Sequence, residues 1–424
     1  MKKIVLVSAV AVLAMAFAGI SGRTMAQTLT ADTVSMSAGY VDEVYYAMPD
    51  GIAKISPRND WDIAFRTQQM SSSILTNDGA GVTLWSYPNA DTTGWETVDT
   101  AGLYTWTPMY NDPADWENGA FSRHALGHPD YGWGVYNAVT HDVVGDSIFI
   151  IQLRDGSFKK FRIIKKNSVA NMYEFKWADL DGGNPVTTGL SLTLFTDVDF
   201  MGFSLPSASI VEYQPPVADW DILFTKYMSV QPDGTPYPVT GVLSNPNVKV
   251  KRFAGVPLTY NDWWVGDWDS TRSPIGWDWK EFNMSTFTYD VVDSLVFFVL
   301  SQNSDIYKLV FTKFEGTSTG NIMFDYGKVS SLGIGGKDRQ MTVTAYPNPA
   351  SDRVHVYFSG NVTGVAEIIL SDLTGKAVRS QRAEVKAGNL EETVIDVTGL
   401  PSGIYLAVIT NGSEKAVQKI VVSR

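Results

Sequence analysis

The stretch NDWDIAF at residues 59–65 recurs as ADWDILF at residues 218–224. Tryptophan is scarce in most chains, so a repeat centred on Trp-Asp-Ile indicates a duplicated unit. Because side chains alternate between the two faces of a strand, the tryptophan, isoleucine and phenylalanine share one predicted face and the second aspartate lies opposite. These residues are Trp61, Ile63, Phe65 and Asp62 in the first copy and Trp220, Ile222, Phe224 and Asp221 in the second.

Short alternating segments dominate the rest of the chain. SIFIIQLRDGSFKKFRII (147–164) predicts a hairpin around Asp155-Gly156, and SLVFFVLSQNSDIYKLVFTKF (294–314) repeats that plan. THDVVGDS (140–147) also resembles TYDVVDS (288–294). The sequence therefore predicts a mainly β protein with two related modules, at 27–185 and 186–328.

The first residues indicate export. Residues 1–26 combine two lysines, a long apolar run and a small residue before Gln27, which is typical of a cleavable signal peptide. The chain has no cysteine, which excludes a lipoprotein, a disulfide framework and a thiolate zinc site.

The charge balance limits the partners. The chain holds 33 basic and 45 acidic residues, a net charge of −12. An acidic surface disfavours nucleic acid and anionic membranes as partners. It also keeps an exported protein dispersed.

The C-terminal part has another composition. Residues 329–341 are predicted to be a linker, and all 13 tryptophans precede it. Residues 342–424 alternate over several short strands with Gly and Pro turns, which predicts an immunoglobulin-like sandwich.

This tail resembles the type A C-terminal sorting domain of type IX secretion. The resemblance rests on YPNP (346–349), SDLTGK (371–376), LPSGIYL (400–406) and KIVV (419–422). It implies contact with the type IX secretion machinery after Sec export, followed by display at the cell surface or release. Removal of the tail is often part of that route.

The body resembles the HmuY-like proteins, a haem-binding family. The motifs are DWDIAFR (60–66), TNDGAGV (76–82), WDILFTKY (220–227), VTGVLSN (239–245) and YKLVFTKFEGTSTGNIMFDY (307–326). The resemblance implies haem capture for iron acquisition, with haem or a host haemoprotein as partner. Most members have one module, so the duplication is a departure.

Three of the four histidines cluster and are the candidate haem ligands. Haem iron needs one or two N or S donors beside a flat apolar slot. His141 matches the family position most readily, and His124 is the favoured second donor. Met109 and His128 are the alternatives.

The second module has a different candidate set. Residues 186–328 contain no histidine, and aligning TYDVVDS with THDVVGDS puts Tyr289 at the position of His141. Tyr289 or Met284 is then the only donor expected there.

The rival function is carbohydrate or protein binding by the segment 261–282. It reads NDWWVGDWDSTRSPIGWDWKEF, with tryptophans interleaved with aspartates. Tryptophan faces stack on sugar rings, and carboxylates accept hydroxyl hydrogen bonds. The candidate residues are Trp263, Trp268, Trp277 and Trp279; the competing interpretation is that they pack the core.

Catalytic and metal motifs are absent from the sequence. There is no GxSxG, HExxH, Walker or GxGxxG motif, so the chain is predicted to be a binding protein without enzymatic activity. His124 and His128 lie in a Gly- and Pro-containing stretch, which disfavours a zinc helix.

Overall fold

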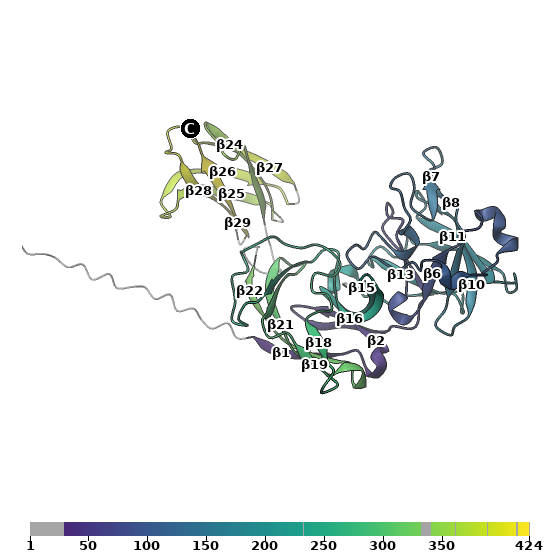
Figure 1. Ribbon diagram of the computed structural model, residues 1–424. Helices are drawn as coiled ribbons and strands as arrows, with labels where there is room; N and C mark the ends of the chain where they lie inside the picture. The colour runs from purple at the N-terminus through teal and green to yellow at the C-terminus, as the bar shows by residue number, and fades with distance from the viewer. Residues whose placement is uncertain are drawn as a thin grey trace, which may run out of the picture.

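The computed structural model describes residues 29–231, 233–331, 341–360, 362–387, 389–412 and 414–423. The predicted signal peptide therefore lies outside the described residues. Antiparallel sheets dominate the fold, as the alternation predicted (Figure 1). Helical structure in the described residues is limited to short 3₁₀ helices: η1 (Ala38–Tyr40), η2 (Asp78–Ala80), η3 (Thr92–Thr97), η4 (Leu103–Thr105), η5 (Ala120–Ser122), η6 (Val217–Asp219) and η7 (Gly316–Ser318).

Two sheets form a unit that we call the inserted unit. One has the order β14–β13–β4–β5; the other has the order β12–β11–β10–β8–β7, with β9 pairing β10 and β6 pairing β9. The strands are β4 (Ile63–Arg66), β5 (Ile74–Thr76), β6 (Thr83–Ser86), β7 (Gly134–Tyr136), β8 (Asp142–Gly145), β9 (Phe149–Gln152), β10 (Phe158–Asn167), β11 (Met172–Asp179), β12 (Val186–Ser191), β13 (Phe200–Ser204) and β14 (Ser209–Val211).

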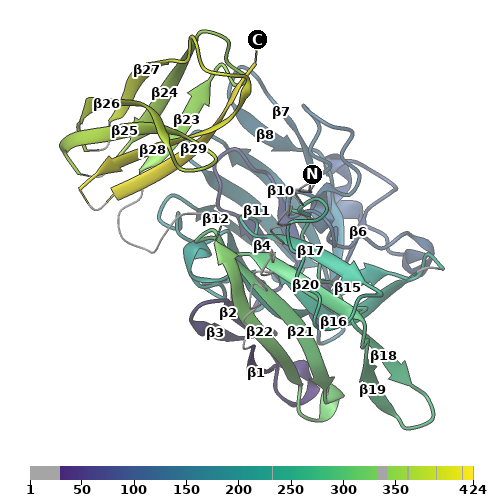
Figure 2. The ribbon, with the colours of Figure 1, turned by 90° about the vertical axis from the view of Figure 1, so that its left-hand side faces the viewer.

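The chain on both sides of it forms the flanking unit. Its sheets have the orders β16–β15–β2–β3 and β1–β22–β21–β20–β17, with a separate β18–β19 hairpin that projects from the body (Figure 2). The strands are β1 (Thr30–Ser35), β2 (Asp42–Ala47), β3 (Gly51–Pro57), β15 (Ile222–Val230), β16 (Pro236–Ser244), β17 (Lys249–Ala254), β18 (Lys280–Asn283), β19 (Thr288–Val291), β20 (Leu295–Leu300), β21 (Asp305–Phe314) and β22 (Asn321–Ser331).

The two units share one strand order, which supports the predicted duplication. β15 occupies the place of β4, and β16 that of β5, so the repeated phrase leads into equivalent strands. β1, β2 and β3 occupy the places of β12, β13 and β14. The flanking unit is thus a permuted copy whose last three strands come from the start of the chain.

This pairing differs from the predicted boundary between 27–185 and 186–328. Thr30 of β1 pairs with Tyr326 of β22, whereas Met172 of β11 pairs with Ser191 of β12. The N-terminal strands therefore complete the second copy, and 186–211 complete the first. β22 also extends to Ser331, and Met341 packs in the core of the C-terminal domain, so both ends of the predicted linker belong to folded units. Residues 332–340 lie outside the described part of the chain.

The repeated phrase places its side chains in two different cores. Ile63 and Phe65 pack inside the inserted unit, and their counterparts pack inside the flanking unit. The tryptophans do not share that face: Trp61 and Trp220 lie in a third cluster with Ala64 and residues of both four-stranded sheets. Each tryptophan precedes its strand, where the alternation of side chains does not yet hold.

This third cluster joins the units, and we call it the inter-unit cluster. Its members are Tyr45, Trp61, Ala64, Leu75, Trp116, Phe200, Tyr213, Trp220, Leu223, Tyr227, Val239 and Leu243. Trp116 also donates its indole N–H to the Ser244 carbonyl, 3.0 Å away in the other unit. A Cβ at Gly79 would lie 1.9 Å from the Lys226 carbonyl oxygen, so the backbones meet where only glycine fits.

Each repeated aspartate is buried in a hydrogen-bonded cluster. In the inserted unit, Asp62 accepts the Leu205 N–H at 2.8 Å and forms an ion pair with Arg154 at 3.2 Å. Asn77 donates its side-chain amide to the Trp61 carbonyl at 2.9 Å. Burial raises the pKa of Asp62, because it disfavours the charged form. The Leu205 N–H and Arg154 act in the opposite direction and offset part of that cost.

The flanking unit repeats that cluster. Asp221 accepts the N–H groups of Met48 at 2.8 Å and Gln302 at 3.1 Å. Asn245 donates to the Trp220 carbonyl at 2.9 Å. The TND and LSN motifs therefore supply the asparagine that fixes the loop before each repeated strand.

The C-terminal domain is a two-sheet sandwich, as predicted. Its sheets have the orders β23–β24–β27 and β26–β25–β28–β29. Tyr405 of LPSGIYL donates its hydroxyl to the Pro401 carbonyl at 2.9 Å, as in the tyrosine corner of such sandwiches. The strands are β23 (Thr342–Tyr346), β24 (Arg353–Ser359), β25 (Gly364–Asp372), β26 (Ala377–Val385), β27 (Leu390–Asp396), β28 (Gly403–Asn411) and β29 (Glu414–Val422).

The strand pairing predicts which fragments fold. Residues 58–214 contain every strand of the inserted unit, so this fragment should unfold cooperatively when its tryptophan fluorescence is followed during heating. Residues 28–185 lack β12, β13 and β14 and should give no cooperative transition. Cooperative unfolding of 28–185 alone would contradict the pairing.

The inter-unit contact predicts a dependence of stability on pH. Glu43 of β2 accepts hydroxyl hydrogen bonds from Tyr45 and Thr225, both at 3.0 Å, and burial raises its pKa from about 4.5 to about 7. The folded state holds this proton more tightly than the unfolded state, so stability should fall as pH rises from about 4.5 through about 7. Asp78, whose pKa burial raises to about 6, contributes in the same direction.

Glu43→Gln should remove part of this slope and stabilise the chain at pH 8 by roughly 1–3 kcal/mol in urea unfolding. Glu96→Gln, at an exposed position, is the control. An unchanged slope in Glu43→Gln would show that Glu43 does not titrate in this window.

Candidate functional site

The structure brings together two of the three clustered histidines. His141 ends the β7–β8 turn, and its Nδ1 lies 2.7 Å from the Tyr136 hydroxyl. The His128 ring lies 5.4 Å from the Tyr136 ring. His128 and His141 are both exposed. Both therefore lie beside Tyr136 at the surface of the inserted unit.

The other two predicted haem ligands are placed differently. Met109 is 3% exposed and packs in the core of the inserted unit, so it is not presented at the surface. His124 is exposed on the segment between η5 and β7. Within the described residues, no group of three or more His, Cys, Asp or Glu side chains is arranged to hold a metal ion.

The strand register corrects the equivalence of Tyr289 and His141. The structural counterpart of His141 is Phe287, since both end the turn of the equivalent hairpin with φ near +60°. Both also donate their N–H to the asparagine that opens the turn, Asn137 at 2.8 Å and Asn283 at 2.9 Å. The alignment of the two similar sequences is therefore shifted by two residues from the structural one. Tyr289 corresponds to Val143, a core position of β8.

A large hollow lies in the flanking unit, and we call it the flanking cleft. Its volume is about 760 Å³, within the range of roughly 300–1,000 Å³ that is common for ligand pockets. The walls come from the segment before β2, the β15–β16 hairpin and the β18–β19 hairpin. Five aromatic residues line it: Tyr40, Tyr237, Trp277, Phe282 and Tyr289.

Charged side chains also line the flanking cleft. Lys226, Lys280, Asp278 and Glu281 line the cleft, two cations against two carboxylates. Lys280 is 6% exposed, and burial lowers its pKa to about 7. Its ammonium donates to the carbonyls of Thr240 at 2.6 Å and Trp277 at 3.1 Å. Lys280 therefore fixes the backbone that carries Trp277 in the wall.

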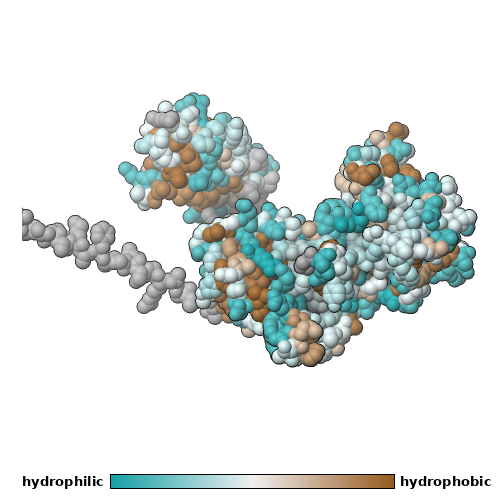
Figure 3. Space-filling model, in the orientation of Figure 1, coloured by the Kyte–Doolittle hydropathy of each residue, from teal (hydrophilic) through white to brown (hydrophobic). Residues whose placement is uncertain are grey.

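Exposed apolar side chains border the cleft. Phe282, Met284 and Phe287 on the β18–β19 hairpin are 46%, 73% and 76% exposed. Figure 3 shows hydrophobic residues gathered over this hairpin, at the lower edge of the view. The Phe282 ring lies 5.1 Å from the Tyr289 ring, so the apolar surface continues from the hairpin into the cleft.

Of the four tryptophans predicted to bind carbohydrate, one lines this cleft. Trp277 is half-buried in the wall, and its indole N–H donates to Ser229 at 3.1 Å. Trp279 is 1% exposed and stacks on Phe311 in the core. Trp263 and Trp268 are half-buried and pack together against the strands of the five-stranded sheet. For these three residues the competing interpretation, that they pack the core, fits the structure.

The cleft includes residues that the sequence analysis missed. Tyr40 and Tyr237 come from segments far from 261–282 in the sequence. The signal that could have found Tyr237 is the repeat itself, because Tyr237 lies in β16, the strand that follows the repeated phrase.

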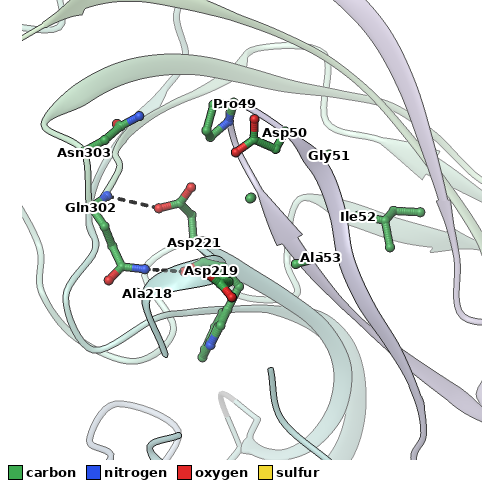
Figure 4. A pocket seen from close by; sticks show the side chains of 12 residues that line it. Pro49, Asp50, Gly51, Ile52, Ala53, Ala218, Asp219, Asp221, Gln302 and Asn303 are labelled. Carbon is green, nitrogen blue, oxygen red and sulfur yellow. Dashed lines mark hydrogen bonds between the residues drawn. The ribbon is translucent and has the colours of Figure 1, made fainter. Parts of the chain in front are cut away.

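A smaller hollow of about 290 Å³ lies where β2 leads into β3 (Figure 4). Asp50, Asp219 and Asp221 line it. Both oxygens of Asp221 accept backbone N–H groups, and Gln302 beside it donates to one of them. We assign this hollow to the buried aspartate cluster that holds the fold.

A family model described as the secretion system C-terminal sorting domain matches residues 344–423. The chain is thus exported by type IX secretion to the cell surface or the extracellular space, and its C-terminal domain interacts with that machinery. The match does not extend into the body, whose HmuY-like resemblance stays a prediction. No helix in the described part of the chain has the length and hydrophobicity needed to cross a membrane.

Two solved structures share limited similarity with the chain. Dimeric latent PorU from Porphyromonas gingivalis is 12% identical, with a TM-score of 0.18, and the match covers 67% of this chain and 31% of that chain. PorZ, a surface component of the type-IX secretion system of the same organism, is 12% identical with a TM-score of 0.15, covering 68% and 44%. The chain spans less than half the length of either, and these scores do not establish a shared fold. No curated protein matches the chain.

Proposed function

We propose that this exported protein is a surface-displayed binding protein that binds carbohydrate in the flanking cleft. The observation that carries the proposal is the position of Trp277 in the wall of a cleft of about 760 Å³, facing a lining rich in tyrosine. Sugar rings pack their C–H faces on such side chains. The activity proposed is binding, with no catalytic step.

The polar lining supports a neutral, hydroxyl-rich ligand. Two lysines and two carboxylates line the cleft, so neither sign predominates among its charged side chains. Gln231, Thr240 and the tyrosine hydroxyls add donors and acceptors between the aromatic faces. In the described structure the side-chain nitrogen of Gln231 is buried without a hydrogen-bond partner, so it is a candidate donor to a ligand hydroxyl.

Trp277→Ala should lower the affinity for carbohydrate by about tenfold or more, because it removes the stacking face. The ligand is first found with an array of mono- and oligosaccharides, and its affinity is then measured by calorimetry. Trp268→Ala is the matched control, since that indole packs beneath the Lys251 ammonium, 4.7 Å from its ring centre. Equal binding by Trp277→Ala and the unmodified chain, or no sugar bound at all, would overturn the proposal.

Haem binding by the inserted unit is the second candidate function. It is supported by the placement of His128 and His141 beside Tyr136. The bond from Nδ1 of His141 to Tyr136 leaves its Nε2 free to donate to iron. The adjacent hollow is lined mostly by hydroxyls, amides and carboxylates, which suits a flat apolar ring less well than the flanking cleft does.

A haemin titration of the full chain tests this candidate. If His141 ligates iron, a sharp Soret band should develop at micromolar haemin, and His141→Ala should weaken and shift it. His355→Ala, in the C-terminal domain, is the control and should leave the band unchanged. Absence of the band under both oxidising and reducing conditions would rule haem out.

A further inference from the structure

The register of two equivalent hairpins identifies a counterpart of Trp277. Gly134 pairs with Gly145 in the inserted unit, and Lys280 pairs with Val291 in the flanking unit, as the first pair of each hairpin. The residue before each pair is a tryptophan buried in its own core, Trp133 or Trp279. Counting two residues further back gives Tyr131 and Trp277.

Tyr131 also lines a cleft, which we call the inserted cleft. Its volume is about 500 Å³. One wall comes from the turn between β4 and β5, which corresponds to the β15–β16 turn of the flanking cleft. The opposite wall comes from the segment before β7, which corresponds to the segment before β18. The chain therefore carries two clefts at equivalent places, each with one aromatic face at the same position of the repeat.

The linings of the two clefts differ in charge. Asp115, Glu117 and Asp130 line the inserted cleft with one guanidinium, that of Arg123. Arg123 forms its ion pair with Asp112, at 2.8 Å. The inserted cleft is therefore acidic, whereas the flanking cleft is balanced.

The buried base of the cleft orders one of these carboxylates. Arg66, 5% exposed, forms ion pairs with Glu117 at 2.5 Å and Asp199 at 3.2 Å. Ser71, 6% exposed, donates its hydroxyl to the other oxygen of Glu117 at 2.6 Å. Glu117 is thus held in place while half of its side chain remains exposed to the cleft.

The other two carboxylates have no cationic partner among the described residues. Asp115 accepts the Glu117 N–H at 2.8 Å, and Asp130 accepts those of Leu126 at 3.0 Å and Gly132 at 2.7 Å. These bonds fix the carboxylates but leave their charge uncompensated. An ammonium group entering the cleft would supply the missing charge and hydrogen-bond donors.

We propose that the inserted cleft is a second carbohydrate site, whose ligand is a saccharide with free amino groups. Tyr131 supplies the stacking face, Gln68 and Asn118 meet ring hydroxyls, and Asp115 and Asp130 bind the ammonium. The choice of a carbohydrate rests on the proposed function of the flanking cleft. The choice of an amine rests on the charge of the inserted cleft alone.

The test compares two probes that differ only at nitrogen: the trimer of glucosamine, with free amines, and its fully N-acetylated form. Calorimetry uses the full chain in a Trp277→Ala background, which removes the stacking face of the flanking cleft. The free-amine trimer should bind, and the acetylated trimer should bind at least about tenfold more weakly. Added salt should weaken the first interaction, because it depends on charge.

Two variants in that background locate the binding. Tyr131→Ala and Asp115→Asn should each lower the affinity for the free-amine trimer by about tenfold, and Asp267→Asn, on the segment before β18, is the control. The amide can still accept the Glu117 N–H, so Asp115→Asn changes charge and little else.

Equal binding of both trimers, or binding that Tyr131→Ala does not change, would overturn the inference, as would no binding. The outcome is independent of the flanking cleft: sugar binding that is absent in the Trp277→Ala background and returns when Trp277 is restored tests the proposed function and not this site.

Discussion

The buried carboxylate of the repeated phrase is the interaction on which the architecture depends. Asp62 binds a backbone N–H just beyond β13, and Asp221 binds one just beyond β2. Each therefore ties the start of its strand to the end of the neighbouring strand in the same sheet. Because such a carboxylate is costly to bury without donors, both sets of contacts are needed at once. The two asparagines complete the constraint by holding the loop that precedes each strand.

With the strands held in this way, the faces of the two four-stranded sheets take opposite roles. The isoleucine and phenylalanine of each phrase fill the core of their own unit. The tryptophan, and the residue between the isoleucine and the phenylalanine (Ala64 or Leu223), join the two units. The hairpins that border the clefts are equivalent in both units and have diverged in sequence. The fold thus supplies two similar binding geometries, whereas the side chains at 115–131 and 277–289 set different ligand chemistry.

The sequence predicted the β class, the duplication and the sorting domain because each rests on local patterns. It did not predict that β1–β3 complete the second copy, since strand pairing across the chain leaves no local signal. Trp61 was assigned to the wrong face because it lies just outside the regular strand. Tyr289 was matched to His141 through similar letters, although the hairpins differ by two positions. Of the tryptophan cluster only Trp277 reaches the cleft, because burial depends on which strands meet there and not on spacing along the chain.

An engineered disulfide tests the permuted pairing most directly, because the natural chain has no cysteine. Thr33 pairs with Met323 across β1 and β22. If β1 instead occupied the place of β12, Thr33 would face Glu174 of β11, the residue that now pairs with Gly189. Two double-cysteine chains, 33 with 323 and 33 with 174, are oxidised and their cross-links measured by mass spectrometry. We expect a cross-link between 33 and 323 only, since paired strand positions meet the geometry of a disulfide. A cross-link between 33 and 174, with none to 323, would contradict it.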